Sequence, residues 1–270
     1  MARHGFIELT LQSFARAISR ALVSEQLVKE KGLLQALDPR VRLLGVLSLV
    51  LAVTLSRRLP VVLGVFILSL AISLASRIRL RSLIGRVWLV AFGFTGFIAL
   101  PAIFTTPGTA AFRLGPLAGT EQGLLTALLL ILRVETAVTL STALVLCTRW
   151  THLLKALRSL GVPAEVITML AMTHRYIFLL IETASQMFES RQSRIAGNLS
   201  AAEQRQLAVS TAGVLFSKTI DLSNDVYLAM QSRGFRGQME LIAEFHMKAV
   251  DYAALASFFI AAGIFIFLGR

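Results

Sequence analysis

Cysteine, proline and charged residues are all scarce in this sequence. Its 270 residues include one cysteine and six prolines, and only 16% are charged while 56% are hydrophobic. The single cysteine, Cys147, lies in an apolar run, which excludes a disulfide framework and a cysteine metal site, so we interpret it as a small buried hydrophobe. The mean hydropathy of +0.72 and the scarcity of charge are typical of a protein that lies in a lipid bilayer.

Patterns for catalysis and metal binding are missing as well. No phosphate-binding loop of the form G-x-x-x-x-G-K-S/T occurs, so we expect that the chain does not itself bind or hydrolyse ATP. Asp221 and Asp225 share a helix face, but no histidine or nucleophile stands beside them, which favours a solvated face or a partner contact. The histidines lack the spacing of metal ligands and are interpreted as surface or interfacial residues: His4, His152, His174 and His246. We therefore predict a non-catalytic chain with no metal or other cofactor.

Five segments are apolar enough to cross a bilayer, whose core requires about 20 helical residues. They lie near residues 41–56, 59–76, 84–104, 121–148 and 249–268. The first two are separated by Arg57-Arg58-Leu59-Pro60, where a turn costs less than a buried double charge. The segment 105–120 has the composition of turns and is expected to be an external loop. The sequence thus predicts an all-α, polytopic membrane protein.

The basic charge indicates how these spans are oriented. The net charge is +12, and 22 of the 27 Lys and Arg residues fall in 1–42, 76–86 and 149–248. Because positive charge gathers on the cytoplasmic side, these segments are expected to be cytoplasmic in a bacterial inner membrane, with the N-terminus inside and the C-terminus outside. Nucleic-acid binding is a weaker explanation of the charge, because hydropathy favours topology as its cause.

This layout divides the chain into four regions. They are 1–40 with amphipathic surface helices, 41–148 with four spans, 149–248 as a cytoplasmic insert, and 249–270 as the final span. Within the insert, an amphipathic helix is expected at 150–160, a long helix from Pro163 to about Gly197, and another that starts at a capping signature in which Glu203 follows Ser200 by three residues. The middle of the long helix holds His174-Arg175, which predicts a tilted helix lying partly in lipid.

Two charged residues, Arg133 and Glu135, fall within the fourth span. They have two interpretations: a structural pair or contacts with neighbouring helices, or a contact with a partner membrane subunit. His174 and Arg175 are weaker candidates for the same partner contact.

Several motifs of the insert and of the first span resemble the T component of energy-coupling-factor transporters. In that family, two small-Arg-small signatures at the ends of long coupling helices contact two ATP-binding-cassette ATPases. Ser232-Arg233-Gly234 matches the second signature well, and Ser193-Arg194 fits the first best, although Ile195 replaces a small residue, so the choice between Arg191 and Arg194 stays open. Leu37-Asp38-Pro39-Arg40-Val41-Arg42-Leu43 is similar to the L-D-P-R-x-K-L entry to the first span of the family, and His174-Arg175-Tyr176 to its Y-R-Y or T-H-R-Y segment.

The resemblance is greatest to the cobalt-uptake branch, the CbiQ type, and it implies partners as well as a function. It implies two ATPases and a separate membrane subunit that binds the substrate, with cobalt ahead of nickel or a vitamin as that substrate. The residues that it implies for ATPase coupling are Ser190, Arg191, Ser193, Arg194, Ser232, Arg233, Gly234 and Arg236.

Two other classes of function compete with this interpretation. A membrane enzyme acting on lipid-linked substrates would need a convergent acidic or histidine cluster, and the sequence shows none. A self-sufficient carrier would usually show internal repeats, whereas four spans, a long insert and one further span form an asymmetric layout.

Overall fold

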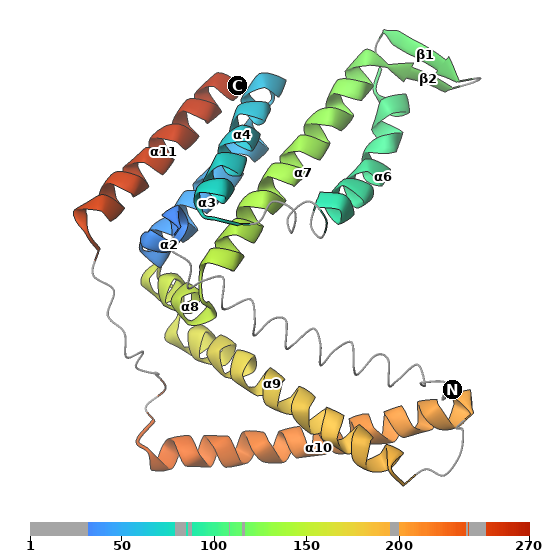
Figure 1. Cartoon of the computed structure of the whole chain (residues 1–270), viewed down its shortest axis with the longest axis vertical. Helices are drawn as coiled ribbons and strands as arrows, with labels where there is room; N and C mark the ends of the chain where they lie inside the picture. Colours follow the sequence, from blue (N-terminus) through green and yellow to red (C-terminus); the bar gives the residue numbers. More distant parts are fainter. Residues whose placement is uncertain are drawn as a thin grey trace. The chain divides into compact units, whose positions relative to one another are not determined.

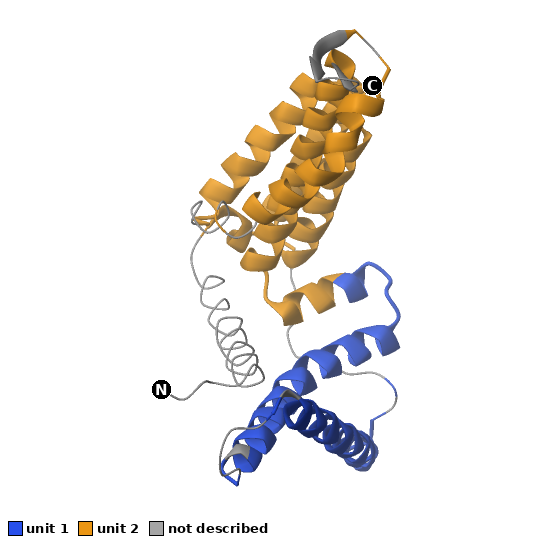
Figure 2. Ribbon diagram, turned by 90° about the vertical axis from the view of Figure 1, so that its right-hand side faces the viewer, with its two compact units in different colours: residues 1–25, 157–243 blue, residues 26–156, 244–270 orange. Residues whose placement is uncertain are grey.

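A computed structural model describes residues 32–78, 85, 88–107, 109–114, 117–194, 200–235, 237 and 247–270 (Figure 1). The chain divides into two compact units (Figure 2), which we call unit 1, within 157–243, and unit 2, within 26–156 and 244–270. Apart from one short hairpin, the regular structure of the described residues is helical, so the predicted all-α class is confirmed.

Unit 2 contains the five segments that the sequence predicts as membrane spans, and each is a helix. They are α3 (Pro39–Leu55), α4 (Leu59–Ala75), α6 (Leu89–Thr105), α7 (Glu121–Cys147) and α11 (Ala249–Gly269). Among the described residues, three helices are long and apolar enough to cross a membrane by length and composition: α7 and α11 of unit 2, and α9 of unit 1. Helices α4 and α6 are also apolar but have only 17 residues each. The chain is a polytopic membrane protein, as predicted.

Unit 1 contains the two long helices of the predicted insert. They are α9 (Ala164–Gln192) and α10 (Ala201–Ser232), and they pack against each other. The shorter amphipathic helix α8 (Trp150–Ser159) is shared, because the boundary between the units falls at residue 157. Of the surface helices expected within 1–40, the structure describes α2 (Leu33–Ala36), and residues 1–31 lie outside the described residues.

Helices α3 and α7 begin where a local side chain accepts a hydrogen bond from one of their first amide groups. The Asp38 carboxylate accepts a hydrogen bond from the Arg40 amide at 2.9 Å, and Pro39 occupies the first helical position of α3, where no amide is needed. The Thr120 hydroxyl accepts from the Gly123 amide at 3.0 Å and starts α7. These caps matter more in lipid than in water, because no solvent can replace a missing partner.

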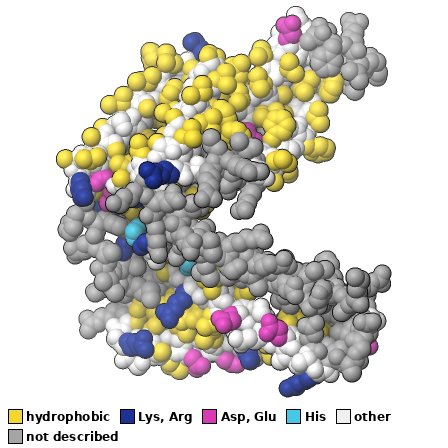
Figure 3. Space-filling model, viewed as in Figure 1, with side chains coloured by type: hydrophobic (Ala, Val, Ile, Leu, Met, Phe, Trp, Pro, Cys, Tyr) yellow, Lys and Arg dark blue, Asp and Glu magenta, His cyan; other side chains and the backbone are white. Residues whose placement is uncertain are grey.

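The outer surface of unit 2 is apolar. Hydrophobic side chains cover most of its visible face in Figure 3, over α11, α4, α7 and α6. The large exposed apolar side chains include Phe92, Phe94 and Phe97 of α6 and Phe267 of α11, the last of which is 84% exposed. A continuous apolar surface of this kind is expected to contact lipid or other membrane helices, not water.

Helix α11 packs parallel to α3 over its whole length. At one end the Asp38 amide donates to the Asp251 carboxylate at 2.9 Å, and at the other the Arg57 amide donates to the Gly269 carbonyl at 2.8 Å. Between these ends the helices approach closely at Gly45, where a Cβ would lie 2.6 Å from the Phe258 ring. A glycine is therefore needed at this point of the α3–α11 contact.

A buried arginine joins the ends of several helices in unit 2, and we call this cluster the Arg42 network. The Arg42 guanidinium is 6% exposed and donates to the main-chain carbonyls of Gln35 at 2.8 Å, Leu37 at 2.5 and 2.8 Å, and Cys147 at 2.6 Å. Cys147 is the last residue of α7, so its carbonyl has no intrahelical donor and carries the negative end of the helix dipole. Arg42 thereby connects α2, α3 and α7.

The external loop expected at 105–120 contains a short β-hairpin, which the sequence analysis did not predict. Strand β1 (Ala110–Leu114) pairs antiparallel with β2 (Leu117–Thr120), with Leu114 opposite Leu117 and an irregularity between Ala110 and Phe112. The pairing supplies hydrogen-bond partners to the main-chain amides and carbonyls of this connection. The Thr120 hydroxyl donates to the Thr106 carbonyl at 2.8 Å and fixes the hairpin to the end of α6.

The close α3–α11 contact predicts opposite effects for two glycine substitutions. Gly45→Ala should lower the free energy of unfolding by about 1–3 kcal/mol, because the added methyl group overlaps the Phe258 ring. Gly263→Ala, on the open face of α11, should raise it by about 0.5–1 kcal/mol through helix propensity alone. Thermal unfolding in detergent measures both. Equal stability of the two variants would contradict the packing of Gly45 against Phe258.

Candidate coupling site

The C-terminal end of α10 presents the Ser232-Arg233-Gly234 segment in a defined conformation. Gly234 has a φ of +77°, its amide donates to the Gln231 carbonyl at 2.9 Å, and the Phe235 amide donates to the Met230 carbonyl at 3.0 Å. This pair of bonds is the Schellman motif, which requires a left-handed residue one position after the helix cap. Glycine adopts that conformation without the steric cost of a Cβ.

Arg233 occupies the cap position of this motif, and its side chain is exposed. Ser232 and Gly234 on either side are exposed too, and the Ser232 hydroxyl donates back to the Ala229 carbonyl at 3.0 Å. The two neighbours are small, so the guanidinium is accessible to a partner from several directions. Arg236, the last residue predicted for this site, lies outside the described residues.

The C-terminal end of α9 carries the other predicted signature. The Ser193 amide donates to the Glu189 carbonyl at 3.0 Å and its hydroxyl donates to the Ser190 carbonyl at 2.9 Å, so this segment continues the helical turn. Ser190, Ser193 and Arg194 are exposed. Both signatures therefore lie at ends of the two long helices of unit 1.

Arg191 differs from Arg194 in its surroundings. Its side chain is half-buried, and Nη1 donates to the Ser210 hydroxyl of α10. Arg191 thus contributes to the packing of α9 against α10, whereas Arg194 projects from the surface. Ser210 is not among the residues that the sequence predicts for this site, because its role depends on how α10 lies along α9.

The start of α10 is fixed by the capping box that the sequence predicts. The Glu203 amide donates to the Ser200 hydroxyl at 3.3 Å, and the Glu203 carboxylate accepts from the Ser200 amide at 2.8 Å. Hydrogen bonds from the amide and hydroxyl of Ser200 hold the pKa of Glu203 below its usual value.

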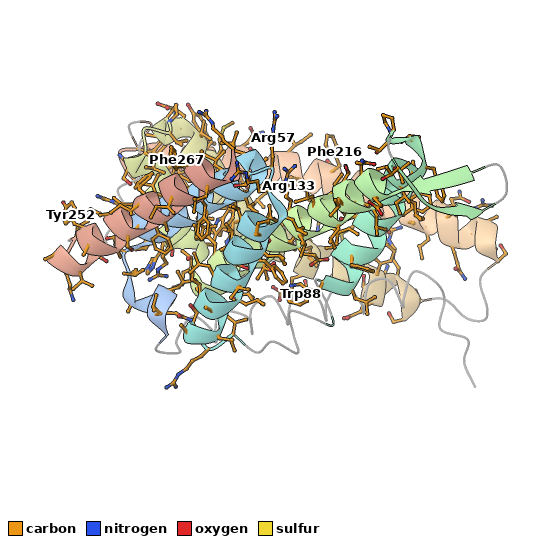
Figure 4. All side chains as sticks on the ribbon, turned by 90° about the horizontal axis from the view of Figure 1, so that it is seen from above. Arg57, Trp88, Arg133, Phe216, Tyr252 and Phe267 are labelled. Atoms are coloured by element: carbon orange, nitrogen blue, oxygen red, sulfur yellow. The ribbon has the colours of Figure 1, made fainter. Side chains whose placement is uncertain are left out.

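Unit 1 also exposes large apolar side chains along both long helices. Met169 of α9 and Val209, Phe216 and Leu228 of α10 are each at least 61% exposed, and Figure 4 marks Phe216 on α10. Charged side chains lie among them in Figure 3. Helices with such mixed surfaces are expected to bind partner surfaces.

Arg133 and Glu135 do not pair with each other, and Arg133 instead makes the contact with a neighbouring helix that their first interpretation also included. Arg133 Nη2 donates to the Ser56 carbonyl at the end of α3, near Arg57 (Figure 4). Glu135 is 6% exposed, and neither carboxylate oxygen has a hydrogen-bond partner among the described residues. A neighbouring helix, and not Glu135, supplies the contact of Arg133.

His174 and Arg175 lie in the middle of α9. The His174 ring meets the Phe178 ring edge-on at a centroid distance of 5.1 Å, and the Arg175 guanidinium lies 5.9 Å from the Tyr176 ring centroid. Arg175 is exposed. Over the part of the chain that the structure describes, no group of three or more His, Cys, Asp or Glu residues could hold a metal ion.

Comparison with known proteins gives the family to which this architecture belongs. The family model described as a cobalt transport protein, CbiQ, matches residues 30–242. An uncharacterized protein of Methanocaldococcus jannaschii is 30% identical over 266 residues, which cover 97% of this chain and 91% of the relative. An energy-coupling factor transporter transmembrane protein, EcfT, of Leuconostoc gelidum is 30% identical over 64% of this chain and 69% of its own length.

The cobalt transport protein CbiQ of Rhodobacter capsulatus is 29% identical over 53% of this chain and 60% of its own length. The family model spans both long helices of unit 1 and four of the five apolar helices of unit 2. The chain therefore belongs to the CbiQ family of cobalt transport proteins, the transmembrane components of energy-coupling factor transporters.

Proposed function

We propose that this chain couples two ATP-binding-cassette ATPases to a separate substrate-binding membrane subunit, and that Arg194 and Arg233 are the residues that contact the ATPases. The observation that carries this proposal is the exposed Arg233, held at the helix cap by the left-handed Gly234. Family membership supports the same assignment.

The chemistry of arginine suits a joint that transmits force. A guanidinium is planar, is always charged and can donate five hydrogen bonds, so it can hold carboxylates and carbonyls of a partner in several directions. At 1.5 Å per residue, the 29 residues of α9 and the 32 of α10 form rods of about 43 and 48 Å. Movement of an ATPase at one end of such a rod would shift the whole helix.

For the first signature we propose Arg194 instead of Arg191. Arg191 already donates to Ser210 within unit 1, and removing it from that contact would weaken the α9–α10 packing. Arg194 is exposed and follows the exposed Ser193, as Arg233 follows Ser232.

The direction of the chain in the membrane follows from the same function. ATPases that use cellular ATP lie in the cytoplasm, so α9 and α10 would be cytoplasmic, with the N-terminus inside and the C-terminus outside a bacterial inner membrane. The concentration of 22 of 27 basic residues in 1–42, 76–86 and 149–248 supports this orientation. The substrate would be cobalt, as the family name and the Rhodobacter capsulatus relative suggest, with nickel or a vitamin as the alternative.

Charge reversal at the two arginines should release the ATPases. Arg194→Glu and Arg233→Glu should each reduce the ATPase recovered with the purified complex by at least about tenfold, because loss of a paired charge costs about 2–5 kcal/mol. Affinity purification in mild detergent measures the recovered ratio.

The matched control is Arg205→Glu, an exposed arginine near the start of α10, which should leave the ratio unchanged. If ATPase recovery were normal for Arg233→Glu, or equally reduced for Arg205→Glu, the proposed contact would be wrong.

Gly234→Ala should disorder the cap that orients Arg233. A Cβ at a φ of +77° costs about 1 kcal/mol, so the amides of Gly234 and Phe235 should exchange hydrogen faster and the ATPase ratio should fall. Gly213→Ala, in the open interior of the same helix, should slow exchange instead. Unchanged exchange at Gly234 and Phe235 in the first variant would argue against the motif.

Uptake by the complete transporter identifies the substrate. Membrane vesicles that contain this chain with its partner subunits should accumulate cobalt when ATP is supplied, and the Arg194→Glu/Arg233→Glu double variant should not. Equal or greater uptake of nickel or biotin under the same conditions would reassign the substrate while leaving the coupling role intact.

A further inference from the structure

Arginines from distant parts of the chain meet at one end of unit 2. The Ser56 carbonyl, at the end of α3, accepts a hydrogen bond from Arg133 Nη2 of α7. The amide of the same peptide group, that of Arg57, donates to the Gly269 carbonyl at 2.8 Å, and Arg270 follows directly. Figure 4 shows Arg57 and Arg133 near each other in the view from above. One peptide group thus links α3, α7 and α11, and we call this site the Ser56 junction.

The main chain of the Ser56 junction is tightly packed. Ser56 is fully buried, and its hydroxyl donates to a main-chain carbonyl of α3 at 2.6 Å. A Cβ at Gly269 would lie 2.5 Å from the Ser56 Oγ, so α11 approaches this turn as closely as a glycine allows. Arg58 caps α4 through its carbonyl, which accepts from the amides of Val61 and Val62 at 3.2 Å. The backbone that carries the arginines is therefore fixed before any ligand binds.

The arginine side chains of the junction are open to a ligand. Arg57, Arg58 and Arg270 are exposed. The Arg133 side chain is half-buried, and its Nε is buried without a hydrogen-bond partner among the described residues. A guanidinium does not release its proton in a protein, so Arg133 stays charged and needs an acceptor for this donor.

The apolar helices offer the junction little negative charge. From the first residue of α3 to the end of α7, and in α11, the sequence contains three acidic residues, Glu121, Glu135 and Asp251. Asp251 lies near the other end of α11, about 27 Å from Gly269 along the helix. Glu121 lies about 18 Å from Arg133 along α7, and Glu135 lies about 200° around that helix from Arg133.

The topology of the chain makes this gathering of positive charge unusual. In the orientation proposed above, 1–42 and 149–248 lie on the other side of the membrane, with their acidic residues. Four basic residues are expected on the outer side, and three of them, Arg57, Arg58 and Arg270, belong to the junction. The outer side of a membrane protein is usually poor in Lys and Arg, so their gathering at one point indicates a local anionic ligand. Even with the main-chain carboxylate of Arg270 counted, positive charge exceeds negative charge here.

Apolar side chains lie next to the arginines. Leu55, in the last turn of α3, is 58% exposed, and Phe267 and Leu268, in the last turn of α11, are 84% and 49% exposed. Both helices end here, so the boundary between the hydrocarbon core and the lipid headgroups falls at the junction. A phospholipid matches both features, because its acyl chains contact the apolar side chains while its phosphate reaches the arginines. A soluble anion would match the arginines alone.

We propose that the Ser56 junction binds the phosphate group of an anionic phospholipid, with Arg57 and Arg58 as its main contacts. Each guanidinium can hold a phosphate through two parallel hydrogen bonds, and Arg133 and Arg270 add positive charge to the site. The bound lipid stabilises the contact of α3 with α4, α7 and α11. The site is separate from the proposed ATPase contacts and shares with that proposal only the orientation of the chain, which places the lipid in the outer leaflet.

Native mass spectrometry of the full chain tests the site by counting the lipids that stay bound after release from vesicles with equal parts of phosphatidylglycerol and phosphatidylcholine. The wild type should retain one phosphatidylglycerol in preference to phosphatidylcholine. Arg57→Gln/Arg58→Gln should reduce this retention at least about tenfold, because each basic residue at an anionic lipid surface contributes to binding. The matched control Arg205→Gln/Lys218→Gln removes two exposed charges from α10 and should retain the lipid as the wild type does.

Four results would overturn the proposal. They are equal retention of the two lipids by the wild type, equal loss in the two double variants, and full retention in Arg57→Gln/Arg58→Gln. The fourth is displacement of the lipid by excess inorganic phosphate, which would assign the arginines to a soluble anion.

Thermal unfolding provides a second readout. In phosphatidylcholine alone the wild type and both double variants should unfold at the same temperature. Added phosphatidylglycerol should raise that temperature for the wild type and for Arg205→Gln/Lys218→Gln, but not for Arg57→Gln/Arg58→Gln. An equal rise in all three proteins would contradict a lipid held at the junction.

The assembled transporter separates the lipid from a protein partner. The complex with its substrate-binding membrane subunit should retain phosphatidylglycerol as the isolated chain does. Loss of the lipid on assembly would overturn the proposal and assign these arginines to an acidic surface of that subunit. Recovery of the ATPases is measured separately, so failure of the lipid site and failure of the coupling proposal are distinguishable.

Discussion

The helix ends of the membrane unit depend on one buried guanidinium. Arg42 donates to carbonyls of Gln35 and Leu37 at the end of α2 and of Cys147 at the end of α7, which are two distant segments of the chain. In lipid no water is present to hydrogen-bond these carbonyls, so each needs a donor from the protein. The guanidinium of Arg42 is planar and has five N–H donors, so one side chain can supply all of them. The neighbouring Asp251 joins α11 to the same region by accepting from the amides of Asp38 and Lys248. The resulting cluster fixes the end of α7 from which the chain continues into α8.

The two units solve different physical problems. Unit 2 has a continuous apolar surface, and its buried Arg42 satisfies main-chain carbonyls at helix ends internally, as a membrane domain requires. Unit 1 has long helices whose apolar side chains are exposed among charges and whose ends carry accessible arginines. A subunit of this kind is incomplete by itself. The proposed ATPases would cover part of unit 1, and the helices would carry their movement toward the membrane.

The sequence predicts this fold well where local rules decide it. Apolar runs located the five long apolar helices of unit 2, with Pro39 and Pro60 at the starts of α3 and α4. The Ser200–Glu203 signature and Gly234 located the ends of α10. It predicts poorly what depends on distant packing. Neither the carbonyl acceptors of Arg42 nor the contact of Arg191 with Ser210 can be read from spacing, and Arg133 bonds to Ser56, 77 residues away, instead of to nearby Glu135. The hairpin after α6 was missed because turn-rich composition does not reveal strand pairing.

The central claim is that the ends of α9 and α10 contact ATPases on the cytoplasmic side. Photo-crosslinking in intact membranes tests it most directly, with a photoreactive amino acid placed at Ser193, at Ser232 or, as a control, at Phe267 at the opposite end of α11 from Asp251. The account predicts crosslinks to the ATPases from positions 193 and 232 and none from position 267. An assembled, active transporter that gave no ATPase crosslink from either of the first two positions would contradict it.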